Sequence, residues 1–401
     1  MKPTLSRRIA LALLAMSGAA LAADIDVMTQ NQYLGADLTP VLDAATAQPF
    51  DPAAFNTELV ATLGRIAATR PAERVRALAD QILQRRHDVV AIQEAYAFGC
   101  QAWPGVPQQA GQGCLDPTVR AAFTDHLADT QAALRGRYYL AGRVTEMNIP
   151  AIPFMVNGVP ALLSVTDRDA IFVRHGVPAK AVDFSATGHC AKPSDQGCNY
   201  QTAPPPQVTP AVTIALERGF LAADVRLHGQ TWRVFNTHFE QRLLAPSLPE
   251  TRLLQVGQAY ELLGAVLGSW DGVKKVLVLG DFNSAPGDTI PVPPYPATLP
   301  WAPKLTVVPP YQVFAGAGFT DVWTLRHPAA PGLTCCQDED LLNRHSALHE
   351  RIDMIFSLSL PSCVEDLRLL GNTPGDKTRR PGHGGLWPSD HAAVAARLLF
   401  H

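Results

Sequence analysis

The sequence has little charge of either sign and no long apolar run beyond its N-terminus. Charged residues make up 17% of the 401 residues, the formal net charge is -3, and the pI is near 6.5. No strong overall field therefore selects nucleic acid or an anionic membrane as a partner, although a local basic patch could still do so. After residue 22 no segment is long enough to span a bilayer. Repeats, low-complexity tails and interdomain linkers are also lacking.

The seven cysteines lack the spacing of a zinc module and the local signature of a catalytic thiol. Disulfides are therefore the expected role, which is typical of exported proteins. One of the adjacent residues Cys335 and Cys336 is expected to bridge to Cys363, leaving one free thiol. Two further pairs flank loops and are predicted to form local disulfides: Cys100 with Cys114, and Cys190 with Cys198.

The N-terminus has the pattern of a secretory signal peptide. Lys2, Arg7 and Arg8 precede an apolar run at 9–16, and the small-x-small sequence ALA at 20–22 suits cleavage. A membrane anchor is the competing interpretation, but the apolar run is too short to span. We therefore expect a signal peptide at residues 1–22 and a protein that is secreted or periplasmic.

The remainder, residues 23–401, is predicted to be one domain. Pro and Gly gather in four loops, at 99–117, 186–210, 285–311 and 371–389, which lie between elements rather than between two halves. Apolar runs and helical periods alternate along the chain, which favours an α/β fold with packed sheets and helices outside. Strands are expected at 24–31, 88–93, 161–165, 170–174, 211–215, 220–227, 232–236, 276–279, 352–356, 364–369 and 392–399, and helices within 53–86, 116–135 and 249–267.

Polar residues recur where the apolar strands stop. Each alone has an ordinary explanation as a solvated strand end or a turn, including Asp281 and Asn283 in GDFN, which would point the same way along a strand. Asp353 interrupts an apolar strand and is harder to dismiss, because a buried carboxylate must be paired. An α/β sheet gathers its strand ends at one edge. The full set is Asn31, Glu94, Asn236, His238, Asp281, Asn283, Asp353, Asp390 and His391.

In this order, the segments TQN, IQE, NTH, GDFN, RIDMIF and SDH resemble the endonuclease/exonuclease/phosphatase superfamily. That group includes deoxyribonucleases, abasic-site endonucleases, inositol polyphosphate phosphatases and bacterial sphingomyelinases. The resemblance extends over residues 24–399. It implies a four-layered α/β sandwich, with two mostly antiparallel sheets flanked by helices, and metal-dependent hydrolysis of phosphoric esters.

A metal site is expected around Glu94, because hard divalent cations prefer oxygen ligands. The resemblance implies Asn31 beside it, and Asp390 is expected to help hold the ion. Mg²⁺ is the expected cofactor, with Mn²⁺ or Ca²⁺ as substitutes. His391 is a natural general base near neutral pH, and Asp353 would fix its tautomer.

The resemblance also gives roles to the remaining polar residues. Asp281 would orient or deprotonate the attacking water, and Asn283 and Asn236 would contact the phosphate. His238 would stabilise transition-state charge or protonate the leaving group. The choice of general base between Asp281 and His391 stays open, as does the use of one or two metal ions.

The sequence leaves the substrate open between a lipid and a nucleic acid. Export, apolar stretches at 149–160 and 291–309, and the aromatic residues Trp301 and Trp387 are compatible with a lipid and peripheral membrane contact, although ordinary packing explains these aromatics too. Basic residues at 377–380 could grip nucleic-acid phosphates, although a solvated turn explains them equally. A soluble phosphomonoester, or a non-catalytic binding protein on the same scaffold, are further alternatives. A monomer is expected.

The first strand departs from the resemblance in one respect. Gln32 and Tyr33 stand where many members of the superfamily have aliphatic and bulky residues. This departure leaves the expected metal ligands in place and bears on the substrate.

Overall fold

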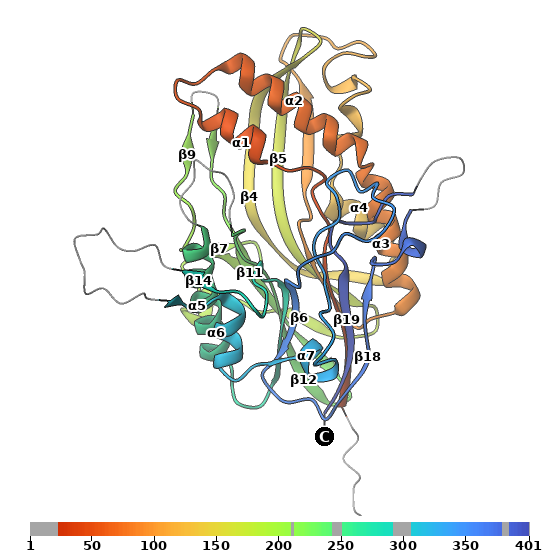
Figure 1. Cartoon of the computed structure of the whole chain (residues 1–401), viewed down its shortest axis with the longest axis vertical. Helices are drawn as coiled ribbons and strands as arrows, with labels where there is room; N and C mark the ends of the chain where they lie inside the picture. The colour runs from red at the N-terminus through yellow and green to blue at the C-terminus, as the bar shows by residue number, and fades with distance from the viewer. Residues whose placement is uncertain (1–22, 210–211, 243–250, 292–305, 379–384, 401) are drawn as a thin grey trace, which may run out of the picture.

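Two β-sheets occupy the centre of the molecule (Figure 1). The computed structural model describes residues 23–209, 212–242, 251–291, 306–378 and 385–400. The expected signal peptide and Trp301 lie outside these residues. Within the described chain, only β1 with β2 and β12 with β13 pair in parallel, so both sheets are mostly antiparallel, as predicted.

The first sheet contains both ends of the described chain. Its strand order is β18-β19-β1-β2-β5-β3, and β4 pairs with β5 beyond this path. Its strands are β1 (Ala23–Asn31), β2 (Val89–Gln93), β3 (Ala97–Ala102), β4 (Tyr138–Val156), β5 (Val159–Arg174), β18 (Cys363–Leu370) and β19 (Ala393–Phe400).

The second sheet is built from the middle of the chain. Its order is β16-β17-β13-β12-β11-β8-β7, and β6 pairs with β11. Its strands are β6 (Ala179–Ala181), β7 (Lys192–Ser194), β8 (Gly197–Asn199), β11 (Gly219–Leu227), β12 (Gln230–His238), β13 (Lys275–Asp281), β16 (Thr320–Asp321) and β17 (Asp353–Ser357). Two small ribbons pair β9 (Gln207–Val208) with β10 (Thr213–Ile214), and β14 (Ile290–Pro291) with β15 (Thr306–Val307).

Apolar side chains from both sheets form one core between them. Val27 and Ile171 of the first sheet share a buried cluster with Leu221, Val234 and Leu277 of the second. These strands present alternate residues to this core because side chains alternate along a strand. Each fully buried aliphatic side chain of this size stabilises the fold by about 1.5–3 kcal/mol. The sheets therefore pack face to face.

Helices cover the outer faces of both sheets. Ile82 of α3 (Pro71–Arg85) and Leu127 of α4 (His126–Ala133) pack on the first sheet. Leu262 of α5 (Thr251–Gly268) and Phe314 of α6 (Pro310–Gly316) pack on the second, and the short α7 (Val322–Arg326) follows β16. The order helix, sheet, sheet, helix agrees with the expected four-layered sandwich.

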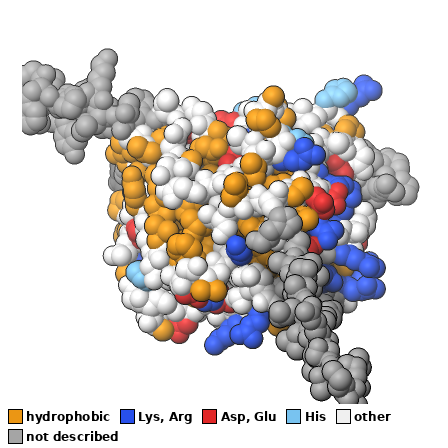
Figure 2. Space-filling model, turned by 90° about the horizontal axis from the view of Figure 1, so that it is seen from below, with side chains coloured by type: hydrophobic (Ala, Val, Ile, Leu, Met, Phe, Trp, Pro, Cys, Tyr) orange, Lys and Arg blue, Asp and Glu red, His pale blue; other side chains and the backbone are white. Residues whose placement is uncertain are grey.

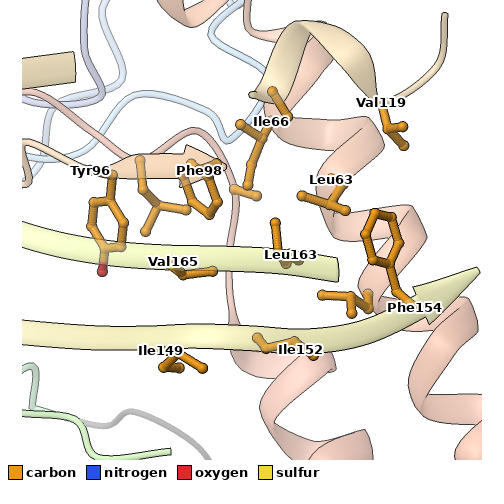
Figure 3. Packing of buried hydrophobic residues seen from close by; sticks show 14 of the residues in the cluster. Leu63, Ile66, Tyr96, Phe98, Val119, Ile149, Ile152, Phe154, Leu163 and Val165 are labelled. Atoms are coloured by element: carbon orange, nitrogen blue, oxygen red, sulfur yellow. The ribbon is translucent and has the colours of Figure 1, made fainter. Parts of the chain in front are cut away.

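A separate apolar cluster extends the first sheet at one end (Figure 3). Leu63 of α2 (Pro52–Ala68) packs there against Leu163 of β5 and Phe154 of β4. The shorter α1 (Thr39–Thr46) closes the same cluster. The apolar stretch at 149–160, which was expected to be a loop, is therefore the end of β4 and the start of β5, with alternate side chains of β4 buried.

The predicted helix at 116–135 is largely wrong. Only α4 is α-helical there, and short 3-10 turns occupy Gly113–Leu115 and Arg120–Ala122. The side chain of Asp116 accepts hydrogen bonds from the amide and the hydroxyl of Thr118, at 2.9 and 2.5 Å. Such local bonds offer the backbone an alternative to the helical pattern.

The disulfide prediction is confirmed for two pairs and wrong for the third. Cys100–Cys114 and Cys190–Cys198 are bridged. Cys335 and Cys336 are joined to each other, while Cys363 is a free, exposed thiol on β18. Cys335 forms β-bridges to Glu350 and His391, which places this disulfide on another part of the molecule from the outer edge of the first sheet.

The surface seen from below carries mixed side chains (Figure 2). Hydrophobic side chains gather toward one side of this face, and Lys and Arg lie toward the other with Asp and Glu among them. This mixture agrees with the small net charge. None of the helices in the described ranges is long and apolar enough to cross a membrane.

Candidate active site

A cleft of about 410 Å³ opens where several strands of the two sheets stop. Three of the residues predicted from strand ends, Asn31, Asn236 and Asp353, lie behind its wall, each at most 1% exposed. The other six line it directly: Glu94, His238, Asp281, Asn283, Asp390 and His391. Residues from six separate parts of the sequence thus meet at one place.

The strand register explains this convergence. In the parallel pair β12–β13, His238 lies opposite Asp281. In the antiparallel pair β13–β17, Asp281 lies opposite Asp353. The last residue of β1, Asn31, pairs with Gln93, which directly precedes Glu94. Because parallel strands end at the same edge, their terminal polar residues meet there.

GDFN serves both as a turn and as part of the site. Gly280 has φ +147°, and a Cβ there would lie 1.9 Å from the carbonyl oxygen of Thr237, so no larger residue fits. Asn283 has φ +45°, and its amide donates to Asp281 Oδ1 at 2.9 Å. A residue other than glycine at positive φ is uncommon and often marks a functional site.

His391 and Asp353 form a buried pair. The distance from His391 Nδ1 to Asp353 Oδ2 is 2.9 Å, and the backbone amide of His391 donates to Ser389 Oγ at 3.1 Å. Burial alone would lower the pKa of His391, but Asp353 and Asp390 outweigh it and hold that pKa well above its usual value. The carboxylate thus orients the ring and stabilises its charged form, as predicted for this pair.

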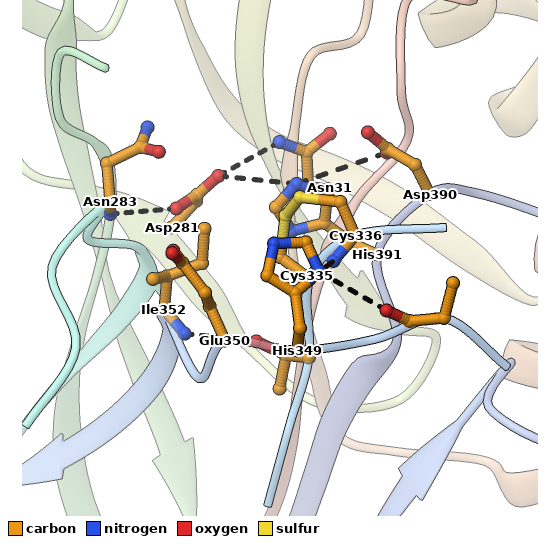
Figure 4. The surroundings of a disulfide bond; sticks show 12 residues. Asn31, Asp281, Asn283, Cys335, Cys336, His349, Glu350, Ile352, Asp390 and His391 are labelled. Atoms are coloured by element: carbon orange, nitrogen blue, oxygen red, sulfur yellow. Dashed lines mark hydrogen bonds and ion pairs between the residues drawn. A yellow bond between two sulfur atoms is a disulfide. The ribbon is translucent and has the colours of Figure 1, made fainter. Parts of the chain in front are cut away.

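Asp281 lies at the centre of the cleft (Figure 4). Its Oδ2 accepts from Asn31 Nδ2 at 3.1 Å and lies 3.5 Å from His238 Nε2 and 3.9 Å from His391 Nε2. Burial, reinforced by the neighbouring Asp353, raises the pKa of Asp281 to about 7. A carboxyl group with such a pKa can take up or release a proton near neutral pH.

His238 is held as a neutral imidazole. Burial lowers its pKa well below the usual value, and the positive charges of Arg218 and His391 lower it further. Arg218 lies 3.0 Å from His238 Nδ1, and a guanidinium can only donate, so Nδ1 accepts. The ring proton therefore sits on Nε2, which faces Asp281. His238 is thereby equipped to donate a hydrogen bond rather than to act as a strong acid.

The donors around Glu94 fit a hard divalent cation. Glu94 has φ +55° and accepts from Asn31 Nδ2 at 3.1 Å and from the amide of Leu34 at 2.9 Å. Burial raises the pKa of Asp390 to about 6, although His391 partly opposes this. Buried carboxylates in excess over cationic groups are what a bound cation would balance. Glu94, Asp390 and Asn31 would hold it, the last after its amide turned, since Asn31 Oδ1 now accepts from Tyr33.

A second arrangement of potential metal ligands lies beside the first. Asp281, Asp353 and His391 each offer a ligand atom within 4.8 Å of the others. The predicted choice between one and two ions therefore stays open.

Asn236 does not reach the cleft, contrary to its expected role in phosphate binding. Its Nδ2 donates to the carbonyl oxygens of Ile92 and Ala170, at 2.9 and 3.0 Å, and its Oδ1 accepts from Gln93 Nε2 at 2.6 Å. All its hydrogen-bonding groups are used to join the two sheets. Asn236 thus positions strands beneath the site.

The disulfide of Cys335 and Cys336 forms part of the cleft wall beside His391 (Figure 4). Nearby, Glu350 forms an ion pair with Arg242 across the rim. This wall could not be predicted, because two adjacent cysteines in a loop do not indicate which residues they face.

Several charged residues of the cleft were also missed. Arg218 and Glu240 line it and are almost fully buried. Each lies at the end of an apolar strand, Arg218 just before β11 and Glu240 two residues after β12. The rule that identified the other site residues could therefore have found them.

Comparison of the sequence with protein-family models and with curated proteins finds no match. Among solved structures, the chain is similar to an endonuclease/exonuclease/phosphatase family protein from Bacteroides thetaiotaomicron (14% identity, 95% of this chain and 99% of that one, TM-score 0.45). It is also similar to a mannosyl-6-phosphatase of the same species (15%, 94% and 100%, 0.45) and to TDP2 from C. elegans (14%, 94% and 75%, 0.43). One of these neighbours carries the name of the superfamily that the motifs resemble.

Proposed function

We propose that the chain is a divalent-metal-dependent hydrolase of phosphoric esters, acting on a phosphodiester. The observation that carries this proposal is the meeting of His391, Asp281 and Glu94 in one cleft, with Asp353 bound to His391 behind its wall. Ester hydrolysis at phosphorus needs an activated water and stabilisation of developing negative charge. The cleft holds groups suited to both tasks.

The protonation states favour one division of roles. Asp281, with its pKa near 7, takes the proton of the attacking water, and the protonated His391 donates to a phosphate oxygen. Asp353 positions His391 and stabilises its charge. His238 donates a hydrogen bond from Nε2, and Asn283 contributes its carboxamide at the rim. A cation on Glu94, Asp390 and Asn31 would neutralise charge on the phosphate.

The charge of the cleft favours a compact ester over a strand of nucleic acid. Among the described residues that line it, Arg218 and Arg242 are the Lys or Arg side chains, while acidic residues are more numerous. Arg218 already pairs with Asp167, and Arg242 with Glu350. A nucleic-acid groove would instead need free basic side chains along its length.

The aromatic residues that suggested a lipid substrate and the basic residues that suggested a nucleic acid both carry less weight than expected. Trp387 is fully buried, with its Nε1 donating to the carbonyl oxygen of Asn343 at 2.8 Å, so it is not available to a membrane. Lys377 lies over the ring of Trp387. The neighbouring positions 379 and 380 lie outside the described residues. A lipid headgroup and a soluble phosphate ester both remain within the proposal, as does peripheral membrane contact.

We further propose export of the chain and action as a monomer. The N-terminal pattern of residues 1–22 supports export, and two loop disulfides are in keeping with an oxidising compartment.

The test uses the chain from residue 23 with Mg²⁺, assayed on plasmid DNA, sphingomyelin vesicles and a soluble sugar monophosphate. His391→Ala and a chelator should abolish any true activity. His345→Ala is the matched control, because His345 is exposed. Cleavage of one substrate, lost in both controls and kept in His345→Ala, would identify the ester class. Failure on all three, followed by failure on a broader set of phosphate esters, would sink the proposal in favour of a non-catalytic binding protein.

A further inference from the structure

A second set of buried charged groups lies beside His238, and three of its members, Asp167, Arg218 and Glu240, also line the cleft. Four carboxylates meet there around one guanidinium, that of Arg218, which is only 8% exposed. We call these the inner carboxylates: Glu146, Asp167, Asp169 and Glu240. None of them was singled out by the sequence, and none has a role in the proposed hydrolysis.

The single positive charge of Arg218 is too small to balance the four inner carboxylates. Its Nη1 lies 3.2 Å from Asp167 Oδ2 and 3.6 Å from Glu146 Oε2, and its Nε lies 3.8 Å from Glu240 Oε1. The same Nη1 also lies 3.0 Å from His238 Nδ1. One positive charge thus faces four acidic groups, and buried charges left in such excess are costly.

The unpartnered oxygens point to a missing ligand. Neither carboxylate oxygen of Asp169 accepts a hydrogen bond, and Glu146 Oε2 lacks one as well. Glu146 Oε1 is satisfied by the amide of Gly219 at 2.7 Å. Both side chains are fully buried. Buried polar atoms of native proteins almost always have a partner, so each exception calls for one.

These oxygens are arranged as a coordination site would require. Glu146, Asp169 and His238 each offer one ligand atom, and the three atoms lie within 4.8 Å of one another. We propose that Glu146 and Asp169, with His238 as third donor, bind a divalent cation distinct from the one expected at Glu94. Two carboxylates and an imidazole suit Mn²⁺ or Zn²⁺ better than Mg²⁺ or Ca²⁺.

The surrounding charges fit this proposal. When the cation binds, Arg218 can keep its contacts with Asp167 and Glu240 and release His238 Nδ1. Without a cation, burial together with the neighbouring acids raises the pKa values of Glu146 and Asp169 well above normal. The site would then hold protons, which the metal displaces on binding.

Occupation of this site would also act on the cleft. His238 reaches both groups, since its Nδ1 faces Arg218 and its Nε2 faces Asp281. A cation on Nδ1 would fix the proton on Nε2 and hold the ring toward the cleft. The inner site would thus act as a structural support for His238.

The test is a titration of the metal-free chain with Mn²⁺, with free Mn²⁺ read by electron paramagnetic resonance. Wild type should bind one more ion per chain than Asp169→Asn or Glu146→Gln, or bind that ion at least tenfold more tightly. Glu94→Gln, which alters the cleft, should keep the inner ion. The proposal is overturned if both inner variants bind as many ions as wild type, with the same affinities.

Thermal unfolding checks that the variants are folded. Asp169→Asn keeps the shape of the side chain and replaces an unpartnered buried carboxyl group. Without metal this variant should therefore melt no lower than wild type, and Mn²⁺ should raise the melting temperature of wild type more than that of the variant. If neither variant folds, wild-type crystals grown with Mn²⁺ decide the matter by anomalous scattering. A peak between Glu146 and Asp169 supports the site, and peaks confined to the cleft contradict it.

Discussion

Two groups of buried carboxylates lie on either side of His238, and they differ in how the protein satisfies them. In the cleft, Glu94 and Asp281 both accept from Asn31, and Asp353 is bound by His391. Among the inner carboxylates, neither oxygen of Asp169 has a partner of good hydrogen-bond geometry, although the backbone amide of Glu94 lowers the pKa of this carboxyl group from nearby. The protein's own groups thus satisfy most oxygens of the cleft carboxylates, with Asp353 Oδ1 as an exception, whereas we propose that a cation from solution completes the inner group.

The difference follows from the sequence around each group. The cleft carboxylates come from strand ends and turns, where free backbone amides and carboxamides are at hand, as with Asn283 and Leu34. Glu146 and Asp169 lie within the paired strands β4 and β5, whose amides are already used by the sheet. A carboxylate in mid-strand must therefore find its partner outside its own pair of strands, as Glu146 does with one oxygen in the amide of Gly219.

The largest effect should come from the cleft. His391→Ala should lower kcat for phosphate-ester hydrolysis about 10³-fold, because a positioned proton-transfer group contributes roughly 10²–10⁴. Asp353→Asn should lower kcat by nearly as much. The double variant should lose little more activity than either single variant, because the two residues act as a unit. Kinetics of the three variants beside His345→Ala would check this. Additive losses would contradict the pairing.

The second prediction concerns the backbone on which the cleft is built. Gly280→Ala should destabilise the fold by about 3 kcal/mol or more, because the new Cβ would meet the carbonyl oxygen of Thr237 and φ is positive. Gly264→Ala, in α5, meets nothing within 4 Å and should be neutral or stabilising by up to about 1 kcal/mol. Urea unfolding measures both. Equal stability of the two variants would refute this view of GDFN.

The third prediction tests whether the carboxylates repel one another in the absence of metal. The pKa of Asp281 is raised from 3.8 to about 7, so its favourable contribution is present below pH 3.8 and is lost as the pH rises through 7. With chelator present, the free energy of unfolding of Asp281→Asn relative to wild type should therefore rise by on the order of 4 kcal/mol between pH 4 and pH 8. Urea unfolding at both pH values measures the gain, and a constant difference would count against it.

The last prediction concerns a buried group outside both sets. Burial, reinforced by Arg74, lowers the pKa of His126 from 6.5 to about 3. Its contribution to stability is present above pH 6.5 and is lost as the pH falls toward 3. Below pH 6.5 the free energy of unfolding should therefore fall less steeply with pH in His126→Leu than in wild type, by up to about 1.4 kcal/mol per pH unit. The same substitution at the exposed His345 should leave this slope unchanged.

Much of the cleft could be predicted because its residues follow apolar strands. The strands that end at Asn31, His238 and Asp281 were all expected, although the last two were predicted to end two residues earlier, at 236 and 279. Their ends meet as the parallel pairing requires. The role of Asn236 could not be predicted, because one residue near a strand end can face the cleft while another faces the opposite sheet. Only packing decides which of them does so.

The first sheet was harder to predict. β4 (Tyr138–Val156) went unrecognised because Pro150 and Pro153 and several register shifts interrupt its alternation. Its partner β5 was expected as two short strands, since the charged TDRD segment at 166–169 breaks the apolar run. That segment carries Asp167 and Asp169, so the charges that hid the strand belong to the inner carboxylates.

The central claim is that the cleft hydrolyses phosphoric esters through its own polar groups and a cation. The most direct measurement is hydrolysis of bis(p-nitrophenyl) phosphate by the chain from residue 23, with Mg²⁺ or Mn²⁺, before and after chelation. We predict activity that chelation abolishes and the metal restores, that falls about 10³-fold in His391→Ala, and that persists in His345→Ala. Activity that survives both chelation and His391→Ala would contradict the account.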